Sequence, residues 1–564
     1  MKNYYGIDFD KKRTELLSSK TAAPMIKEIV ARADAALEKT YAALKFSDYM
    51  LFAETGDRKT FQLPFSERRN DCSYLSIAYW LSEDEKYKKP LEDLIFHICD
   101  EFTWCLPAHS LIWGTPTAEQ ILREVDLRQA ETSRLLTDIY LLLGDKLHYL
   151  VKQRIEFEIR RRVFDSFKYK EFHWLKPSCK TNWAAVCAGG ILNPLLLFGT
   201  KEQIDDILPA LYEAIEHFLL GFGDDGCCME GCSYWSFGFE YFVLFAKHIF
   251  EYTGGEVNYF AREKVKAIAT FIQRARLTES TTVTFSDCNP GLSFSPGLLS
   301  FLKTVYPDDI KLPPLKYGTR IGNIYSMKEL LWFISDYKED ALVDGASYFE
   351  NAEWYISRYP KYSFAAKAGH NNEPHNHNDI GSFLVVTADE KMPLVDLGAG
   401  EYTAFTFDEN HRYKMIEHAS FGHSVPIING KYQIEGEEYR ATNVFATESS
   451  FSFDMEGAYE SGLVKKLRRT FELSCDGITL CDRVEYSDAT ESITERFVST
   501  VKPEMGDGSV KIGGVRMLYD KERYTPSLGI DSYVNHQVER VDIYLLDFTS
   551  KNERETEFRF EIAI

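Results

Sequence analysis

The spacing of apolar residues changes once along the chain. Up to about residue 330, apolar side chains recur every three or four positions, most clearly in residues 23–44, 130–167 and 203–222. This period is that of a helix with one buried face. Gly-containing turn signals such as "LGDK" and "TGGE" separate the periodic stretches. We therefore predict an all-α region in the first part of the chain.

After about residue 335 the pattern becomes one of short runs rich in Val, Ile, Tyr and Phe, punctuated by Gly, Asp and Asn. Clear examples are residues 424–434, 463–487, 540–548 and 555–564. Runs of this kind predict strands joined by tight turns, and many of them together favour an antiparallel β-sandwich. The change falls within 320–350, and we predict an all-α domain over 1–335 and a β-sandwich domain over 336–564.

Net charge narrows the range of partners. The chain carries a net charge of −21 and has no block of Lys and Arg. Nucleic acid and anionic membrane surfaces are therefore poor partners. A cleft can still be locally basic, so an acidic small substrate stays compatible with this charge.

Compartment is predicted from the first residues and from the cysteines. The first twenty residues lack an apolar signal core, and no stretch approaches the roughly 20 apolar residues of a membrane span. The eleven cysteines stand in irregular positions, which is typical of a reducing compartment. Cys227 and Cys228 lack a second CxxC pair, so we expect buried free thiols there. We predict a cytoplasmic protein.

Two polar stretches in the helical region are candidates for function. In "KTNWAAVCAGGIL", Asn182 and Trp183 precede a helix start, where an Asn is also a common N-cap. In "EGCSYWSFGFEYF", Tyr234, Gly238 and Tyr241 recur at helical spacing. Tyrosines along a helix are more often core residues than site residues, so both interpretations stay open.

A third polar stretch opens the β-region with "HNHNDIGSF". His375 and His377 stand two positions apart, and on a strand such residues point to the same side. Imidazole and carboxylate groups from neighbouring strands form tetrahedral zinc sites. The candidates within fifty positions are His375, His377, Asp379, Asp396, His418 and His423. The spacing is no zinc-finger signature, so a metal is one interpretation and hydrogen-bonded structural histidines are the other.

The order "TNW", "EGCSYWSFG" and "HNHNDIGSF" resembles the heparinase II/III-type polysaccharide lyases. The resemblance covers most of the chain as an order of motifs. It implies an incomplete (α/α) toroid followed by an antiparallel β-sandwich domain, with a cleft between them. It also implies a carbon–oxygen lyase that cleaves glycans containing uronic acid, of glycosaminoglycan or alginate type, by β-elimination to a 4,5-unsaturated uronate.

The resemblance assigns roles to single residues. Asn182 matches the residue that helps to neutralise the substrate carboxylate. Tyr234 matches a tyrosine that acts as base, acid or both, and His375 matches the catalytic histidine of the β-domain.

The resemblance also implies a bound zinc that organises the site. His377, Asp396 and a later histidine match its ligands. His423 fits that third position better than His418, because it directly precedes a predicted strand. We expect this zinc to be structural.

The implied chemistry explains why these groups are needed. Removing the C5 proton places a second charge on an ionised carboxylate, so donors must stabilise an enolate-like dianion. A free phenol has a pKa of about 10 and needs nearby positive charge or hydrogen-bond donors to act near neutral pH. Either Tyr234 or His375 could be the base, and the sequence leaves this open.

Further substrate-binding candidates are Trp183, Glu230, Arg412 and Tyr413. Glu230 precedes Tyr234 by one helical turn, where an acid at a helix start is equally common. Arg412 could hold a carboxylate or sulfate bidentately, or it could be an ordinary surface residue.

Two other classes of protein remain as alternatives. An inverting glycoside hydrolase on an (α/α) toroid would need two carboxylates, for which Asp224 or Asp225 with Glu230 are available. A non-catalytic carbohydrate-binding protein would not need Tyr234 or His375. We predict an acidic oligosaccharide or polysaccharide as the partner in the lyase case.

Overall fold

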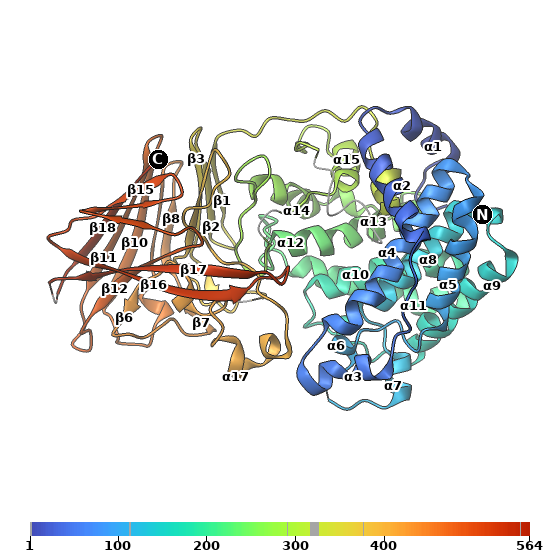
Figure 1. Cartoon of the computed structure of the whole chain (residues 1–564), viewed down its shortest axis with the longest axis horizontal. Coiled ribbons are helices and arrows are strands. Elements are labelled where there is room, and N and C mark those ends of the chain that lie inside the picture. Colours follow the sequence, from blue (N-terminus) through green and yellow to red (C-terminus); the bar gives the residue numbers. More distant parts are fainter. Residues whose placement is uncertain (1–2, 112–113, 290–291, 316–325, 376, 553) are drawn as a thin grey trace. The chain divides into compact units, whose positions relative to one another are not determined.

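The chain contains a helical N-terminal part and a C-terminal part of antiparallel strands (Figure 1). The computed structural model describes residues 3–111, 114–289, 292–315, 326–375, 377–552 and 554–564. The chain divides into two compact units, each built from three segments. Unit 1 comprises Met1–Gly221, Trp235–Lys266 and Ser293–Asp340, and unit 2 comprises Phe222–Tyr234, Ala267–Leu292 and Ala341–Ile564.

Unit 1 is made of helices that pack on one another, as the apolar period predicts. Its α-helices are α1 (Phe9–Ser18), α2 (Ala23–Leu37), α3 (Phe46–Thr55), α4 (Lys59–Ser82), α5 (Lys88–Asp100), α6 (Pro107–Ser110), α7 (Ala118–Arg123), α8 (Leu127–Leu143), α9 (Tyr149–Ile159), α10 (Asn182–Phe198), α11 (Lys201–Leu220), α13 (Glu240–Tyr252), α15 (Pro296–Val305) and α16 (Ser326–Trp332). Helix α14 (Glu263–Arg274) runs from residues of unit 1 into residues of unit 2. Among the described residues, no helix is both long and apolar enough to cross a lipid bilayer.

Local sequence sets where several of these helices begin. Helix α11 starts at a capping box in which Thr200 accepts from the Gln203 backbone and the Gln203 side chain accepts from the Thr200 backbone. Helix α8 starts at Asp126, whose carboxylate accepts from the Gln129 backbone N–H. Caps of this kind satisfy backbone N–H groups that the first helical turn leaves without a partner.

Helix α10 lies at the centre of unit 1 and packs against α8, α11 and α13. It is apolar on almost every side, which is typical of a fully buried helix. Two adjacent glycines allow the close packing. A Cβ added at Gly189 would lie 2.3 Å from the Tyr241 carbonyl oxygen of α13, and one at Gly190 would lie 2.9 Å from the Ala130 backbone of α8.

Unit 2 contains the strands. They are β1 (Gly345–Phe349), β2 (Trp354–Arg358), β3 (Tyr362–Lys367), β4 (His370–Asn371), β5 (Phe383–Thr387), β6 (Ile427–Ile428), β7 (Gly436–Arg440), β8 (Thr442–Ala446), β9 (Ser450–Asp454), β10 (Lys466–Ser474), β11 (Gly477–Glu485), β12 (Ile493–Ser499), β13 (Glu504–Gly506), β14 (Ser509–Ile512), β15 (Val515–Leu518), β16 (Tyr524–Val534), β17 (Arg540–Ser550) and β18 (Glu557–Ala563). The short helices α12 (Cys232–Tyr234) and α17 (Glu409–Arg412) also belong to this unit.

The strands form four sheets in which every pairing is antiparallel. The sheet orders are β1-β2-β3-β5, β13-β14-β15-β18-β11-β10-β9-β8, β16-β17-β12-β6 and β4-β7. Aromatic side chains from different sheets meet in one core: the ring centroid of Phe471 lies 4.9 Å from that of Phe364 and 5.1 Å from that of Phe383. This is the packing of a β-sandwich, and with the helical unit 1 it gives the predicted fold of an (α/α) toroid and an antiparallel sandwich.

The first of two segments from the helical half that belong to unit 2 is residues 222–234. The Asp225 carboxylate accepts from the Asn351 backbone N–H at 2.8 Å, which ties this segment to the turn after β1. The segment ends at Tyr234. Two of the predicted site residues from the helical half, Glu230 and Tyr234, are therefore part of the β-unit.

The second segment is residues 267–292. The Thr284 hydroxyl donates to the Asp396 backbone carbonyl at 2.8 Å, and the Phe285 ring packs edge-on against Trp354 with 5.2 Å between centroids. This segment carries Asp287. A single domain boundary between residues 335 and 336 would place both segments in the helical domain, although both pack with strands of unit 2.

Candidate active site

Tyr234 and His375 lie in face-to-face contact in unit 2. Their ring centroids are 4.2 Å apart and the ring planes differ by 15°. Tyr234 is the last residue of α12, immediately before the π-helical turn Trp235–Phe239. Such turns insert one residue into a helix and are frequent at functional sites. The two residues that the sequence motifs nominated for catalysis therefore lie together.

His375 lies in the loop between β4 and β5, and not on a strand as we expected. Its φ of 55° lies in the left-handed region, which is uncommon for a residue other than glycine and costs conformational energy. His375 and His377 nevertheless converge on one group. His375 Nδ1 lies 2.8 Å from one carboxylate oxygen of Asp287, and His377 Nε2 lies 3.0 Å from the other. Both imidazoles therefore point to the same carboxylate, but from a loop and not from the strand that we expected.

Asp287 connects the residues of the site, and no sequence motif indicated it. Its side chain is buried, and burial alone would raise the pKa of the carboxyl. The hydrogen bonds from His375 and His377 outweigh burial and hold the pKa of Asp287 well below its ordinary value. In the sequence it stands in "SDCNPG", which has the composition of an ordinary turn.

Tyr402 is a second residue that the sequence did not indicate. Its hydroxyl oxygen lies 2.6 Å from that of Tyr234, and it donates to Asp287 at 2.5 Å. Burial and the nearby Asp287 carboxylate raise its pKa well above the ordinary value for tyrosine. Tyr402 therefore connects Tyr234 to the carboxylate that also holds the two histidines.

Glu230 completes the surroundings of His375. Its carboxylate lies 3.3 Å from His375 Nε2, on the other side of the ring from Asp287. Burial opposes the charged form of the imidazole, but Asp287 and Glu230 together raise the pKa of His375 to about 9. Glu230 therefore contacts the catalytic candidate His375, which is a more specific role than an acid at a helix start.

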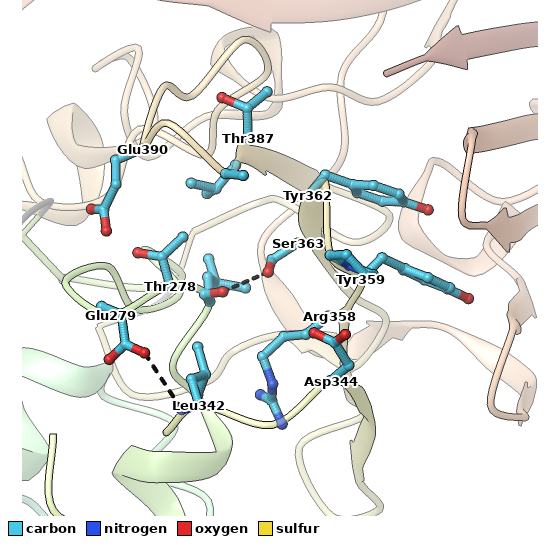
Figure 2. A pocket seen from close by; sticks show the side chains of 14 residues that line it. Thr278, Glu279, Leu342, Asp344, Arg358, Tyr359, Tyr362, Ser363, Thr387 and Glu390 are labelled. Atoms are coloured by element: carbon cyan, nitrogen blue, oxygen red, sulfur yellow. Dashed lines mark hydrogen bonds between the residues drawn. The ribbon is translucent and has the colours of Figure 1, made fainter. Parts of the chain in front are cut away.

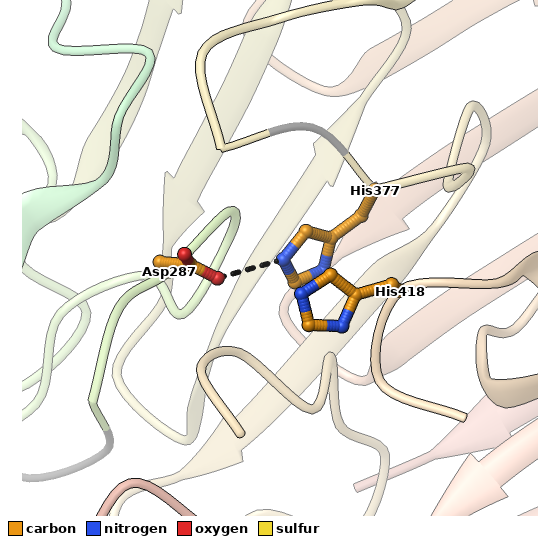
Figure 3. Close-up of side chains that lie close together, drawn as sticks. All are labelled: Asp287, His377 and His418. Carbon is orange, nitrogen blue, oxygen red and sulfur yellow. Dashed lines mark hydrogen bonds and ion pairs between the residues drawn. The ribbon is translucent and has the colours of Figure 1, made fainter. Parts of the chain in front are cut away.

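A buried histidine pair lies next to this network. The rings of His377 and His418 stack with 4.8 Å between centroids, and Figure 3 shows them facing Asp287. His377 Nδ1 and both ring nitrogens of His418 have no hydrogen-bond partner among the described residues. Burial, and then the neighbouring His377, lower the pKa of His418 well below its ordinary value. Neutral imidazoles with available nitrogens are the form that binds zinc.

Two ligand groups among the described residues could hold a metal, and His377 belongs to both. In each, one ligand atom per residue lies within 4.8 Å of the others: Asp287, His377 and His418 form one group, and His377, Asp379 and His423 form the other. The Lys367 ammonium lies 2.8 Å from Asp379. A cation at Asp379 would be repelled by this ammonium, so charge favours the group with Asp287.

The sequence-based zinc ligands Asp396 and His423 are also buried and in contact. His423 Nδ1 lies 3.1 Å from Asp396 Oδ2, and the Ser382 hydroxyl donates to the same oxygen at 2.7 Å. His423 Nε2 lies 3.2 Å from the Glu417 backbone carbonyl. Both nitrogens of His423 thus have partners, unlike those of His418. The assignment of His377, Asp396 and His423 as the ligand set stays a prediction.

Asn182 and Trp183 belong to unit 1, at the start of α10. Thr181 is the N-cap residue and Asn182 is the first residue of the helix, so Asn182 is not the cap. The half-buried Trp183 contacts two histidine rings, with centroids 4.8 Å from His109 and 6.0 Å from His173. His109 is oriented by Asp126, whose carboxylate lies 2.6 Å from its Nδ1. These two histidines have no motif of their own in the sequence.

Arg412 and Tyr413 lie at the end of α17 and are half-buried. The Arg412 guanidinium donates to the Thr406 backbone carbonyl at 3.0 Å. Its charge also acts on the buried His418 and Glu417, so it is more than a freely solvated surface residue. Its role as a substrate ligand stays a prediction.

Two of the three carboxylates that a hydrolase could use, Asp225 and Glu230, have other partners. Asp225 accepts from two backbone N–H groups, those of Asn351 and Cys227. Glu230 contacts His375. Cys227 and Cys228 are buried free thiols, as the sequence predicts.

Unit 2 also contains a pocket of about 190 Å³ with a different lining (Figure 2). Three carboxylates, of Glu279, Asp344 and Glu390, and the Arg358 guanidinium are part of this lining. Arg358 donates to the backbone carbonyls of Val343, Arg274 and Arg276, and therefore acts as a structural connector. Residues of the Tyr234 and His375 network do not contribute to this pocket.

Comparison with known proteins gives matches at the level of structure. No family model matches the chain, and no curated protein matches its sequence. A heparinase III structure matches with a TM-score of 0.61 at 14% identity, over 95% of this chain and 84% of that one. The heparan sulfate lyase of Pedobacter heparinus matches with a TM-score of 0.58 at 12% identity, over 95% and 83% of the two chains.

A chondroitin AC lyase of Streptomyces coelicolor, solved in complex with chondroitin sulphate, has a TM-score of 0.57 at 8% identity, over 98% of this chain and 82% of that one. At these identities the similarity concerns the fold. The chain has the fold of the heparinase-like polysaccharide lyases.

Proposed function

We propose that the protein is a polysaccharide lyase that cleaves uronic-acid-containing glycans by β-elimination and releases a 4,5-unsaturated uronate. The observation that carries this proposal is the stacked pair of Tyr234 and His375, held by Glu230, Asp287 and Tyr402. Proton abstraction next to a carboxylate needs a base and a cationic donor close together. A stacked phenol and imidazole flanked by two carboxylates supply both.

The environment of His375 favours the donor role for this residue. Its two ring nitrogens each face a carboxylate, Asp287 on one side and Glu230 on the other. Both nitrogens donate in such an arrangement, so the imidazole is held as a cation. A cation can stabilise the enolate-like dianion but has no lone pair to accept a proton. Tyr234 is then the group that takes the C5 proton or returns one to the leaving oxygen.

Asn182 is proposed to donate its amide to the substrate carboxylate, the role that the motif resemblance implies. Trp183 offers an aromatic ring that contacts the rings of His109 and His173. Aromatic faces suit the apolar side of a sugar ring, and histidines suit an acidic substituent. Arg412 and Tyr413 are proposed as further substrate ligands from unit 2.

The substrate class is an acidic oligosaccharide or polysaccharide of glycosaminoglycan or alginate type. The structural neighbours include proteins named for heparan sulfate and chondroitin. These neighbours share the fold but are named for different substrates. The fold therefore supports the class of substrate, and an experiment must identify the individual glycan.

A structural zinc at His377 is part of the proposal. The unpartnered nitrogens of His377 and His418 beside Asp287 fit a metal that binds nitrogen and oxygen ligands. Such an ion would fix the loop that carries His375, and it would be a Lewis acid when bound. The roles proposed for Tyr234, His375 and Asn182 need no step on the metal.

Mass spectrometry of the cleavage products tests the reaction type. The purified protein is incubated with a defined uronate oligosaccharide, and the masses of both fragments are measured. In β-elimination the fragment masses add up to the substrate mass, with one fragment short of a water. Fragments that together contain one added water would show hydrolysis and would overturn the lyase proposal.

A further inference from the structure

We infer that His109 and Trp183 form a sugar subsite in unit 1 that binds an anionic substituent, and that His109 takes up a proton when the anion binds. The inference rests on the proposed lyase function, because it adds a subsite for the acidic substrate of that proposal. The anionic group is a carboxylate or a sulfate, since both offer a negative charge and acceptor oxygens to an imidazolium.

The carboxylate of Asp126 fixes the orientation of the His109 ring. It lies 2.6 Å from His109 Nδ1, and it also accepts from the backbone N–H groups of Leu106 and Gln129. Burial alone would raise the pKa of this carboxyl, but His109 and the two backbone groups lower it below its ordinary value. An ionised carboxylate can only accept, so His109 Nδ1 carries a proton.

The second ring nitrogen, His109 Nε2, is available to a ligand. It has no hydrogen-bond partner among the described residues, and 11% of the His109 side-chain surface stays exposed. Burial lowers the pKa of His109, Asp126 opposes this effect, and the positive charges of Arg58 and Arg128 lower the pKa further. The imidazole is therefore neutral at neutral pH in the free protein, with a lone pair on Nε2.

The partly exposed charges that act on His109 are positive, although the whole chain is acidic. Arg58 precedes α4 and Arg128 lies in the first turn of α8, and both arginines are half-buried. The carboxylates that offset part of their charge, those of Asp126 and Glu131, are fully buried. Glu131 lies 2.7 Å from Arg128. An anion that approaches His109 from solvent therefore meets the arginines first.

An anion at His109 Nε2 would favour the charged imidazole. A carboxylate or sulfate at hydrogen-bond distance raises the pKa of a histidine, because it stabilises the cation. His109 then takes a proton from solvent at Nε2 and donates it to the anion in a charge-assisted hydrogen bond. The Trp183 ring packs edge-on against His109 and offers aromatic surface to the sugar that carries the anion. The affinity should rise as the pH falls through the pKa of His109 in the complex, and level off below its lower pKa in the free protein.

Isothermal titration calorimetry measures this proton uptake, with Tyr234→Phe as a background that does not turn over the probes. The probes are hexasaccharides of hyaluronan, which carries carboxylates, of heparan sulfate, which also carries sulfates, and of chitin, which is neutral. Each titration is run at about pH 6.5, the ordinary pKa of histidine, in two buffers that differ in their enthalpy of ionisation. The difference between the two heats gives the number of protons taken up. We expect uptake with the anionic probes and none with chitin.

Two further variants assign the uptake to His109. His109→Gln keeps a polar group that does not titrate, and His109→Phe keeps a ring. Each should abolish the uptake and weaken binding of the anionic probes at least about tenfold, the loss of a hydrogen bond between charged groups. Glu124→Gln is the control, because burial and then Asp126 raise the pKa of Glu124 to about 7, so that it titrates in the same range. This variant should keep the uptake.

The outcomes separate this inference from the proposed function. Tighter binding and larger uptake with heparan sulfate than with hyaluronan would identify sulfate as the anion, and equal values would identify the carboxylate. Unchanged uptake in both His109 variants would overturn the inference, as would binding of neither anionic probe or equally tight binding of chitin. Uptake that depends on His109, in a protein whose parent form cleaves no glycan, would overturn only the proposed function.

Discussion

At the scale of single residues, the candidate site is organised by one carboxylate. Asp287 accepts from His375, His377 and Tyr402, and so it connects the stacked pair with the buried histidines. A buried carboxylate that accepts from three donors holds each donor in one orientation. The geometry of Tyr234 and His375 therefore depends on a residue that needs no contact with substrate.

Removing the reactive groups should separate activity from folding. Tyr234→Phe deletes one hydroxyl, and His375→Ala deletes the imidazole that stacks on it. We expect each to lower kcat at least about 100-fold, since general acid–base groups contribute by that order or more. The midpoint of chemical unfolding should change little for Tyr234→Phe, because the ring stays. Near-parent kcat in either variant would show that its residue is not catalytic.

Acid sensitivity of unit 1 should depend on His248. This imidazole is buried, its ring packs edge-on against Tyr5, and neither nitrogen has a hydrogen-bond partner among the described residues. Burial lowers its pKa from 6.5 to about 3. Between these values the unfolded chain binds a proton that the folded chain does not. The free energy of unfolding therefore falls as the pH is lowered, by about 1.4 kcal/mol per pH unit.

The measurement is the free energy of unfolding in urea at several pH values between 7 and 4, for the parent and for His248→Phe. The variant should lose less stability on acidification than the parent. Identical pH slopes in the two proteins would mean that His248 is protonated in the folded state.

The sequence indicated some of these residues and missed others for a physical reason. Tyr234, His375 and Glu230 stand inside short motifs with recognisable neighbours. Asp287 and Tyr402 stand alone in turn-like sequence, and Tyr402 is 168 positions from Tyr234. Only tertiary folding brings such residues together, so no local sequence pattern can indicate that they belong to the site.

At the scale of elements, the position of Asn182 depends on how α10 packs in unit 1. Gly238 lies in the π-helical turn before α13, and a Cβ added there would lie 2.9 Å from the Asn182 Cβ. The sequence showed Gly238 as part of a helical repeat with Tyr234 and Tyr241. In the structure, Gly238 matters because it has no side chain and therefore leaves room for Asn182.

Gly238→Ala should therefore displace Asn182 and destabilise unit 1. Overpacking of this kind costs about 1–3 kcal/mol, because the neighbours must move. Thermal unfolding of the variant measures the loss. Gly529→Ala in β16 is the control, since its Cβ would meet Leu545 at an ordinary 3.5 Å. Equal stability of the two variants would contradict the close packing at Gly238.

Elements with a strong apolar period were predictable, and the loop at 372–382 was not. Strands β10, β11 and β18 lie within predicted runs, and β17 extends two residues beyond its run. His375 and His377 stand two positions apart, which is also the spacing of residues on one face of a strand. Their side chains bind Asp287 from a loop, and the positive φ of His375 is a local strain that no propensity predicts.

Metal binding should follow the buried histidines. We expect His377→Ala and His418→Ala to lower zinc content, measured by elemental analysis after dialysis, and to lower the melting temperature together with it. His97→Ala is the control, because His97 is exposed on α5. Full zinc content in His418→Ala with loss in His423→Ala would favour the ligand set with His423. If the parent protein contains no zinc even after incubation with the ion, the proposed zinc site is wrong.

At the scale of the whole molecule, the apolar period correctly indicated a helical part followed by a β-part, and the motif resemblance correctly indicated the toroid and sandwich fold. The assignment of residues 222–234 and 267–292 to unit 2 could not be read from the sequence, because both segments flank helices. These two segments bring Tyr234 and Asp287 to the histidines. The chemistry of the site therefore depends on a feature of topology and not on either domain type alone.

One assay can follow the proposed β-elimination from a uronate directly. Purified protein is mixed separately with heparan, chondroitin, hyaluronan and alginate oligosaccharides, and the ultraviolet absorbance of a conjugated unsaturated uronate is followed. We expect a rise in absorbance with at least one of these substrates and none with Tyr234→Phe. New reducing ends without any rise in absorbance, in the parent protein, would contradict the proposed β-elimination.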